Sequence, residues 1–198
     1  MVDGYSFDEF ATVSPDENTL TYLKDPYERP DKLHVAGKVT VGNQPSSLTS
    51  LRDPGGRAWP SDEPAFAVSN RGDDSVSLVS FGKKRELAVT GEVPVGDAPS
   101  DLAANDTLDV LVINKGSGDV TLVSGSYSGE NDTLEFRATQ TLPAGNSPAA
   151  VIATGARPGK EGIAYLVVNE GSNTVTTYGW DGDQLGVLES IRVGDRCT

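Results

Sequence analysis

The chain has 198 residues, a length suited to one well-packed domain; 36% are hydrophobic, and the frequent Gly (22) and Pro (12) indicate short strands joined by many turns. The 29 acidic and 16 basic residues give a formal net charge of −13, so repulsion argues against nucleic acid and anionic membranes as partners. The one cysteine, Cys197, excludes an intramolecular disulfide, and no apolar stretch approaches the roughly 18 residues of a membrane span.

The N-terminus, MVDGYSFDEF, has neither the basic segment nor the apolar run of a signal peptide. If Met1 is the native start, we expect a cytoplasmic protein. If the chain is a mature segment or a fragment, an extracytoplasmic location is also compatible. A lone cysteine does not report the redox compartment, so the location stays open between the two.

One pattern repeats along the chain about every 50 residues. A Val-Gly-x-x-Pro turn, with Ala for Val in one copy, occupies residues 41–45, 95–99 and 144–148, and residues 193–197 match it with Cys in place of Pro. Each Pro-terminated copy is followed by an apolar residue, a variable loop, an apolar run that ends in Asn-x-Gly, and an alternating stretch. Alternation with a period of two predicts strands, so each unit is expected to hold four.

The first unit, residues 7–41, is a degenerate copy. We expect residues 10–13 to be its inner strand and residues 19–24 its second strand, joined by a Ser-Pro-Asp-Glu-Asn turn. It lacks Asn-x-Gly and carries a Pro-rich segment at 25–30, so a third strand near residues 32–36 is poorly marked.

Three clear units follow, at residues 42–95, 96–144 and 145–194. In the unit 96–144 the predicted strands are 99–104, 108–114, 119–124 and 134–142. Asn bonds nearby backbone and Gly can adopt positive φ, so Asn-x-Gly predicts a tight hairpin after the second strand. We assign a structural role to the repeated turn residues, which are Asn70, Gly72, Asn114, Gly116, Asn169 and Gly171.

The predicted fold is all-β: a β-propeller with four antiparallel strands in each blade, comprising three clear blades and one degenerate N-terminal blade. A small sheet with apolar residues on both faces cannot bury them alone, so the copies are expected to stack face to face. We expect residues 1–198 to form a single propeller domain or a propeller fragment.

The Val-Gly-x-x-Pro turn combined with the apolar-Asn-x-Gly hairpin resembles the YVTN-type repeats of lactonase-like (phosphogluconolactonase-like) β-propellers, most clearly in residues 164–178. The resemblance covers residues 39–194 well and 7–38 poorly. It implies a blade type rather than an activity, because the group includes lactone hydrolases and many proteins without a known reaction. The family usually closes seven blades, which favours a partial propeller here; the alternatives are a closed four-bladed ring and self-association that completes a propeller.

Successive strands alternate in direction, so the Val-Gly-x-x-Pro and Asn-x-Gly turns are expected on one rim, where loops on a rigid scaffold can carry function. Our first hypothesis is a non-catalytic scaffold that binds a small polar ligand or a protein partner there. The candidate ligand-binding residues are Arg71, Asp73, Asp97, Lys115, Glu170 and Arg196. Charged exposed turns are common in all proteins, which is the competing explanation. Trp59, in the loop 52–64, is suited either to anchor a partner or to cover a blade end.

The second hypothesis is a lactonase-like hydrolase acting on a sugar or organic-acid lactone. His34 is the only histidine, so a two-His metal site is excluded and no catalytic residue can be assigned. Asp181-Gly182-Asp183 lacks the other oxygen ligands of a calcium loop and is expected to be a turn between the third and fourth strands. We predict neither a metal nor a cofactor and leave open whether the protein is an enzyme, which would need convergent ionisable groups with perturbed pKa values.

Overall fold

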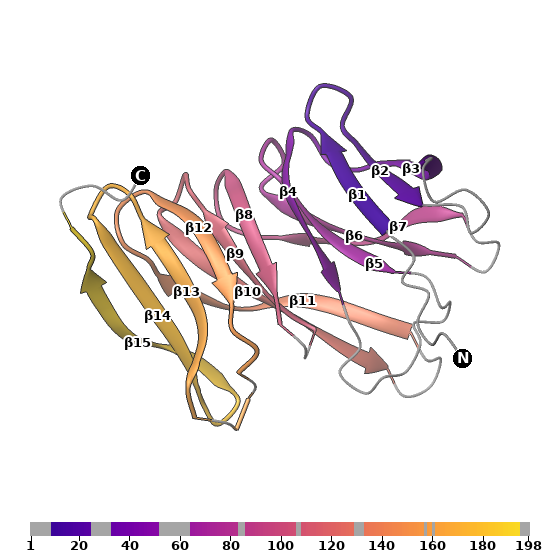
Figure 1. Cartoon of the computed structure of the whole chain (residues 1–198). Coiled ribbons are helices and arrows are strands. Elements are labelled where there is room, and N and C mark those ends of the chain that lie inside the picture. Colours follow the sequence, from indigo (N-terminus) through magenta and orange to yellow (C-terminus); the bar gives the residue numbers. More distant parts are fainter. Residues whose placement is uncertain are drawn as a thin grey trace, which may run out of the picture.

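The computed structural model describes residues 9–24, 33–51, 64–82, 86–105, 108–128, 133–156, 158–159 and 161–194. Within these ranges the fold is all-β, with fifteen strands in four antiparallel sheets and no helix (Figure 1). The first sheet contains β1 (Glu9–Ser14), β2 (Thr19–Lys24) and β3 (His34–Thr40), and the second contains β4 (Pro45–Leu51), β5 (Ala65–Asn70), β6 (Ser75–Phe81) and β7 (Leu87–Pro94). The third contains β8 (Pro99–Ala104), β9 (Asp109–Asn114), β10 (Asp119–Ser128) and β11 (Thr133–Pro143), and the fourth contains β12 (Pro148–Ala153), β13 (Ile163–Asn169), β14 (Thr174–Asp181) and β15 (Gln184–Arg192).

Each sheet is a meander in which every strand pairs with the next one along the chain. This confirms the predicted β-propeller blades, and in the third sheet the four strands begin within one residue of their predicted positions. The Pro residues that start β4, β8 and β12 stand at the first position of an edge strand, where a missing N–H costs no ladder hydrogen bond.

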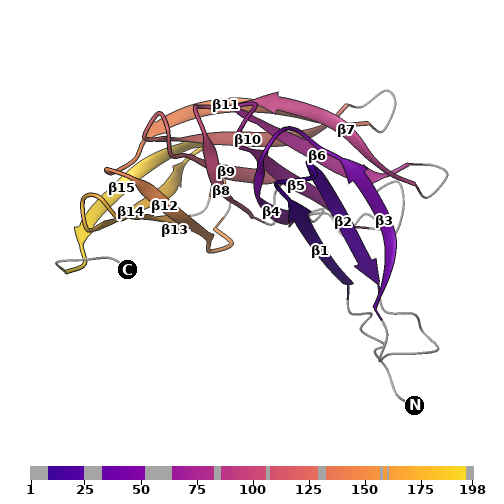
Figure 2. The same ribbon diagram turned by 90° about the horizontal axis from the view of Figure 1, so that it is seen from above.

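The four sheets follow one another round an arc, with β4, β8 and β12 on its inner side and β7 and β11 on its outer side (Figure 2). Three apolar cores lie between successive sheets. We call the side of a sheet that points to the next sheet its forward face and the other its backward face. On β9, Leu111 and Ile113 belong to the forward face, and Val110 and Val112 to the backward face.

Strand β9 therefore reads as an unbroken apolar run because both of its faces are covered, and all six of its residues are buried. Burying a Val or Leu side chain contributes about 1.5–3 kcal/mol, so stacking stabilises an interior sheet strongly. The same side chains in an isolated sheet would face water. Neighbouring blades are therefore required for the stability of each one.

The first sheet corrects our assignment of its strands. Val41 N–H donates to Asn18 O (2.9 Å) just as Val95 N–H donates to Asp74 O (2.9 Å), which makes the β1–β2 turn equivalent to the Asn-x-Gly hairpin of the next blade. Asn18 and Asp74 also share a positive φ, 54° and 51°. β1, β2 and β3 are thus the second, third and fourth strands of a blade, and the described part of this sheet contains no inner strand.

The physical reason for the error is that Ser14-Pro15-Asp16-Glu17-Asn18 forms the hairpin without the Asn-x-Gly signature. Ser14 pairs with Thr19 as Asn70 pairs with Ser75, so the backbone geometry survives the change of residues. The strand expected near 32–36 begins two residues later, as β3, and it is the fourth strand of the blade rather than the third.

Candidate functional site

The two turn types lie against each other on one rim. Gly72 N–H donates to Asn43 O (2.9 Å), and Gly116 N–H donates to Asp97 O (2.9 Å). Gly171 N–H makes the same bond to Asn146 O (3.0 Å). Each Asn-x-Gly turn is therefore held by the Val-Gly-x-x-Pro turn that precedes it.

The asparagines of Asn-x-Gly point into the protein rather than to the rim surface. Asn70, Asn114 and Asn169 are all 0% exposed. In each blade the Nδ2 group donates to the hydroxyl of the residue seven positions further along the chain, at 2.8–2.9 Å. These hydroxyls belong to Ser77, Thr121 and Thr176. A ligand on the rim surface cannot reach these buried side chains.

The glycines of Asn-x-Gly do not supply the positive φ that we expected of them. That conformation falls two residues later, at Asp74 (φ 51°), Gly118 (φ 73°) and Asn173 (φ 53°). At Gly116, a Cβ would instead lie 2.9 Å from Asp97 O, so the glycine allows the two turns to approach closely. The requirement is steric and comes from the neighbouring turn.

Among the charged candidates, the structure brings Lys115 and Glu170 together across the third and fourth blades, with Nζ and Oε2 3.8 Å apart. Both side chains are about half exposed, so this pair contributes at most about 1 kcal/mol. Arg71 and Asp97 are also placed on this rim, in the Asn-x-Gly turn of the second blade and in the turn before the third. Arg196 lies outside the described residues, and His34 begins the exposed edge strand β3.

The carboxylate of Asp73 is hydrogen-bonded to the neighbouring turn. It accepts hydrogen bonds from the backbone N–H of Asn43 (2.7 Å) and from Asn43 Nδ2 (2.7 Å). These bonds, the backbone one first, hold the pKa of the Asp73 carboxyl below its ordinary value. Asp73 therefore has a role in joining the two turns.

A pH prediction follows for Asp73. Because its folded-state pKa is depressed, its stabilising contribution is present above the ordinary Asp pKa of about 3.9 and is lost as the pH falls through the lower folded value. We expect Asp73→Asn to reduce the acid-induced fall of the melting temperature below about pH 4. Melting curves of the wild-type chain and the variant from neutral to acid pH test this, and parallel curves would contradict it.

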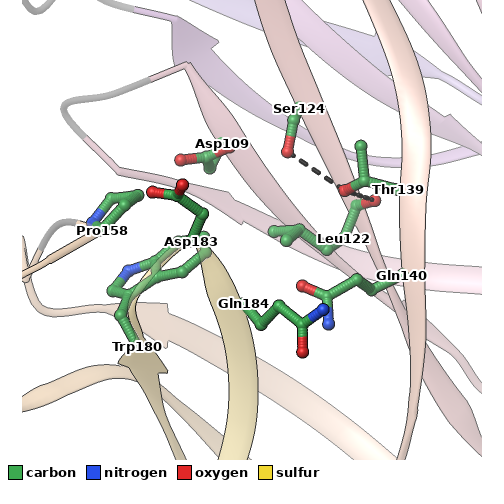
Figure 3. A pocket seen from close by; sticks show the side chains of 9 residues that line it. All are labelled: Asp109, Leu122, Ser124, Thr139, Gln140, Pro158, Trp180, Asp183 and Gln184. Atoms are coloured by element: carbon green, nitrogen blue, oxygen red, sulfur yellow. Dashed lines mark hydrogen bonds between the residues drawn. The ribbon is translucent and has the colours of Figure 1, made fainter.

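A second candidate site is a cleft of about 370 Å³ between the third and fourth blades, on the rim opposite the Asn-x-Gly turns (Figure 3). It lies where β9 starts and where β14 turns into β15. Its lining residues are Asp109, Leu122, Ser124, Thr139, Gln140, Pro158, Trp180, Asp183 and Gln184. Five chain segments meet here, around residues 109, 122–124, 139–140, 158 and 180–184.

The β14–β15 hairpin positions one wall of the cleft. Its two-residue loop, Gly182–Asp183, has a positive φ of 59° at Gly182, as a type II′ turn requires, which confirms the turn expected there. Trp180 Nε1–H donates to Ala156 O (3.3 Å). Gln140 holds the hairpin to β11, because its Oε1 accepts from Leu185 N–H (2.9 Å) and its Nε2 donates to Leu185 O (3.1 Å).

The remaining lining groups combine an aromatic surface with oxygen acceptors. Figure 3 shows the carboxylates of Asp109 and Asp183 facing the same space beside Trp180. Across the cleft, Ser124 Oγ and Thr139 Oγ1 share a hydrogen bond (3.2 Å). Sequence reasoning recognised 181–183 only as a turn; the Trp immediately before it was the available signal for a site.

Among the described residues, no group of three His, Cys, Asp or Glu side chains is arranged to hold a metal ion. The part of the chain that the structure describes also has no helix long and apolar enough to cross a membrane.

No protein-family model and no curated protein matches the chain. Solved structures do match. A protein of Bacteroides uniformis ATCC 8492, provisionally assigned as a 6-phosphogluconolactonase, aligns with a TM-score of 0.64 and 14% identity over 95% of this chain and 54% of its own. A protein from Lactobacillus plantarum aligns with a TM-score of 0.56 and 16% identity over 92% of this chain and 54% of its own.

A protein of Bacteroides fragilis NCTC 9343, also provisionally assigned as a 6-phosphogluconolactonase, aligns with a TM-score of 0.51 and 12% identity over 96% of this chain and 68% of its own. The chain thus spans about half the length of two of these structures. At these identities the similarity concerns the fold alone. The fold of this chain is that of β-propeller proteins, among them the two provisionally assigned lactonases.

Proposed function

We propose that this propeller segment is a non-catalytic binding module for a small polar ligand, held in the cleft between the third and fourth blades. The single observation that carries the proposal is the meeting of Trp180, Asp183 and Ser124 around one cleft of about 370 Å³. That volume falls in the range of about 300–1,000 Å³ for small-molecule sites. Gln140 and the β14–β15 turn preform the wall.

The ligand class follows from the chemistry of the lining. An indole covers the apolar face of a ligand, while carboxylate and hydroxyl oxygens accept hydrogen bonds from its polar groups. A hydroxyl-rich molecule of monosaccharide size offers both an apolar C–H face and several O–H donors. The charged residues on the Asn-x-Gly rim remain a second surface, suited to a protein partner, where Lys115 and Glu170 lie together.

The distribution of perturbed pKa values supports binding over catalysis. Lys38 lowers the pKa of the exposed Glu17, and Asn43 lowers that of Asp73. Burial raises the pKa of Tyr165 and Tyr178 inside the fourth blade. Glu17 and Asp73 are exposed on the first two blades, and the two tyrosines pair with each other inside the fourth, so these groups do not gather around one space as those of a catalytic site do.

The alternative function is a lactonase-like hydrolase, and the observation that favours it is the similarity of fold to the two Bacteroides proteins. Proton release from glucono-1,5-lactone in a pH-stat tests it. A protein-dependent rate that disappears in Asp183→Asn would establish this alternative in place of the binding module.

The binding proposal is tested by fluorescence. Trp59→Phe leaves Trp180 as the only tryptophan, so its emission reports on the cleft. We expect titration of this variant with a panel of neutral monosaccharides and polyols to give saturable changes for at least one. Because a hydrogen bond to a charged group is worth about 1.5–3 kcal/mol, Asp183→Asn should weaken that binding about tenfold or more.

The matched control is Asp181→Asn, which removes an equal charge from the same hairpin. Asp181 is exposed, pairs with Gln184 across the turn and does not line the cleft, so its loss should leave the affinity unchanged. A panel without any saturable change, or equal effects of the two variants, would contradict the proposal.

A further inference from the structure

We propose that two copies of this chain bind head to tail through the two end faces of the arc and close a ring. Inside the chain, each pair of neighbouring blades buries the forward face of one blade on the backward face of the next, in three successive cores. In the described structure, no further blade covers the backward face of the first blade or the forward face of the fourth. Figure 2 shows these two blades at opposite ends of the arc.

The backward face of the first blade carries a phenylalanine at the position that, in the second blade, packs against the preceding blade. Phe10 stands four residues before Ser14, as Phe66 stands four residues before Asn70, and the two strands share the same register. Phe66 is 5% exposed and packs beside Tyr22 of the preceding blade (ring centroids 6.0 Å apart). Phe10 is 50% exposed, an unusual state for a phenylalanine on a sheet face.

The forward face of the fourth blade carries the apolar residue for the other side of this junction. Ile191 pairs with Val175 as Val93 pairs with Val76 in the second blade. Val76 and Val93 are buried at 0% and 4% because the third blade covers them. Ile191 is 44% exposed.

A second copy is the occupant that both faces fit. A forward face and a backward face pack on each other three times within the chain, so the end faces are halves of a contact whose geometry the fold already shows. The contact is heterologous, and such contacts form a closed ring when the rotation closes. The chain spans 54% of the Bacteroides uniformis structure, so two copies supply about the length of one such chain.

The experiment is light scattering coupled to size-exclusion chromatography of the 198-residue chain. The expected mass is twice 20.8 kDa. Phe10→Glu and Ile191→Glu, each placing a charge on one end face, should each halve the mass while far-UV and near-UV circular dichroism stay unchanged. The control is Val89→Glu on the outer strand of the second blade; Val89 is 40% exposed on an interior blade, so the mass should remain doubled.

Mixing the two variants provides the decisive arm. Phe10→Glu keeps an intact forward face and Ile191→Glu an intact backward face, so the mixture regains one junction and part of the doubled mass. A folded monomer in the wild-type chain would overturn the proposal and show that other blades or another protein cover the end faces. A mass that climbs steadily with concentration would overturn the closed ring, and a mixture that stays monomeric would overturn the head-to-tail contact.

Discussion

Replacing Tyr165 by Ala is expected to lower the free energy of unfolding by about 3–5 kcal/mol, the range for removing a buried aromatic ring. Tyr165 is 0% exposed in the core between the third and fourth blades. Its hydroxyl donates to Asp109 O (2.9 Å), so it also joins the two blades directly. Urea unfolding followed by circular dichroism measures the change.

Tyr165→Phe separates the ring from its hydroxyl. This variant keeps the packing and leaves Asp109 O without that donor, so we expect a loss of about 1–2 kcal/mol. If Tyr165→Ala and Tyr165→Phe cost the same, packing is not the main contribution of the ring. A loss below about 1 kcal/mol for Tyr165→Ala would show that the two blades do not rely on this core.

Comparing the wild-type chain with Tyr165→Phe at alkaline pH gives a further test. Burial, the largest cause, and then the charge of Asp109 raise the pKa of the Tyr165 hydroxyl. A raised folded-state pKa leaves the full stability below the unfolded value of about 10 and removes it as the pH rises above that value. Wild-type stability should therefore fall more steeply above about pH 10 than that of Tyr165→Phe.

The second large effect is expected for Gly145→Ala, with a loss of about 3 kcal/mol from overpacking and broken hydrogen bonds. A Cβ at this position would lie 2.6 Å from Cγ and 2.8 Å from Cβ of Asn169. Asn169 cannot withdraw without losing its bonds to Thr176 (2.9 Å) and to Gly145 N–H (3.0 Å). The variant therefore tests whether the two repeated turns are coupled through this buried side chain.

Gly186→Ala is the matched control for that substitution. No heavy atom lies within 4 Å of a Cβ built at Gly186, and its φ is not positive. We expect its free energy of unfolding to change by less than about 1 kcal/mol. Equal losses at Gly145 and Gly186 would mean that a general cost of alanine in these sheets, rather than contact with Asn169, explains the effect.

The sequence by itself determined the blades. The Val-Gly-x-x-Pro turn predicts the start of β8, and Asn-x-Gly predicts the end of β9, because turns and period-two alternation are local properties of the backbone. Repetition strengthened the prediction, since each copy had to form the same meander. Where the signature was absent, as at Ser14–Thr19, the strands were found but placed one position too early in the blade.

Only the tertiary structure decided what the repeated residues touch. The glycine of Asn-x-Gly is required by the backbone of another turn, as Gly116 shows with Asp97, and that neighbour lies 19 residues away in the chain. The cleft depends on still longer separations: Asp109, Gln140 and Trp180 come from three segments that share no local pattern. Such sites form when blades pack, because stacking brings together side chains whose spacing in the sequence has no relation to their distance in space.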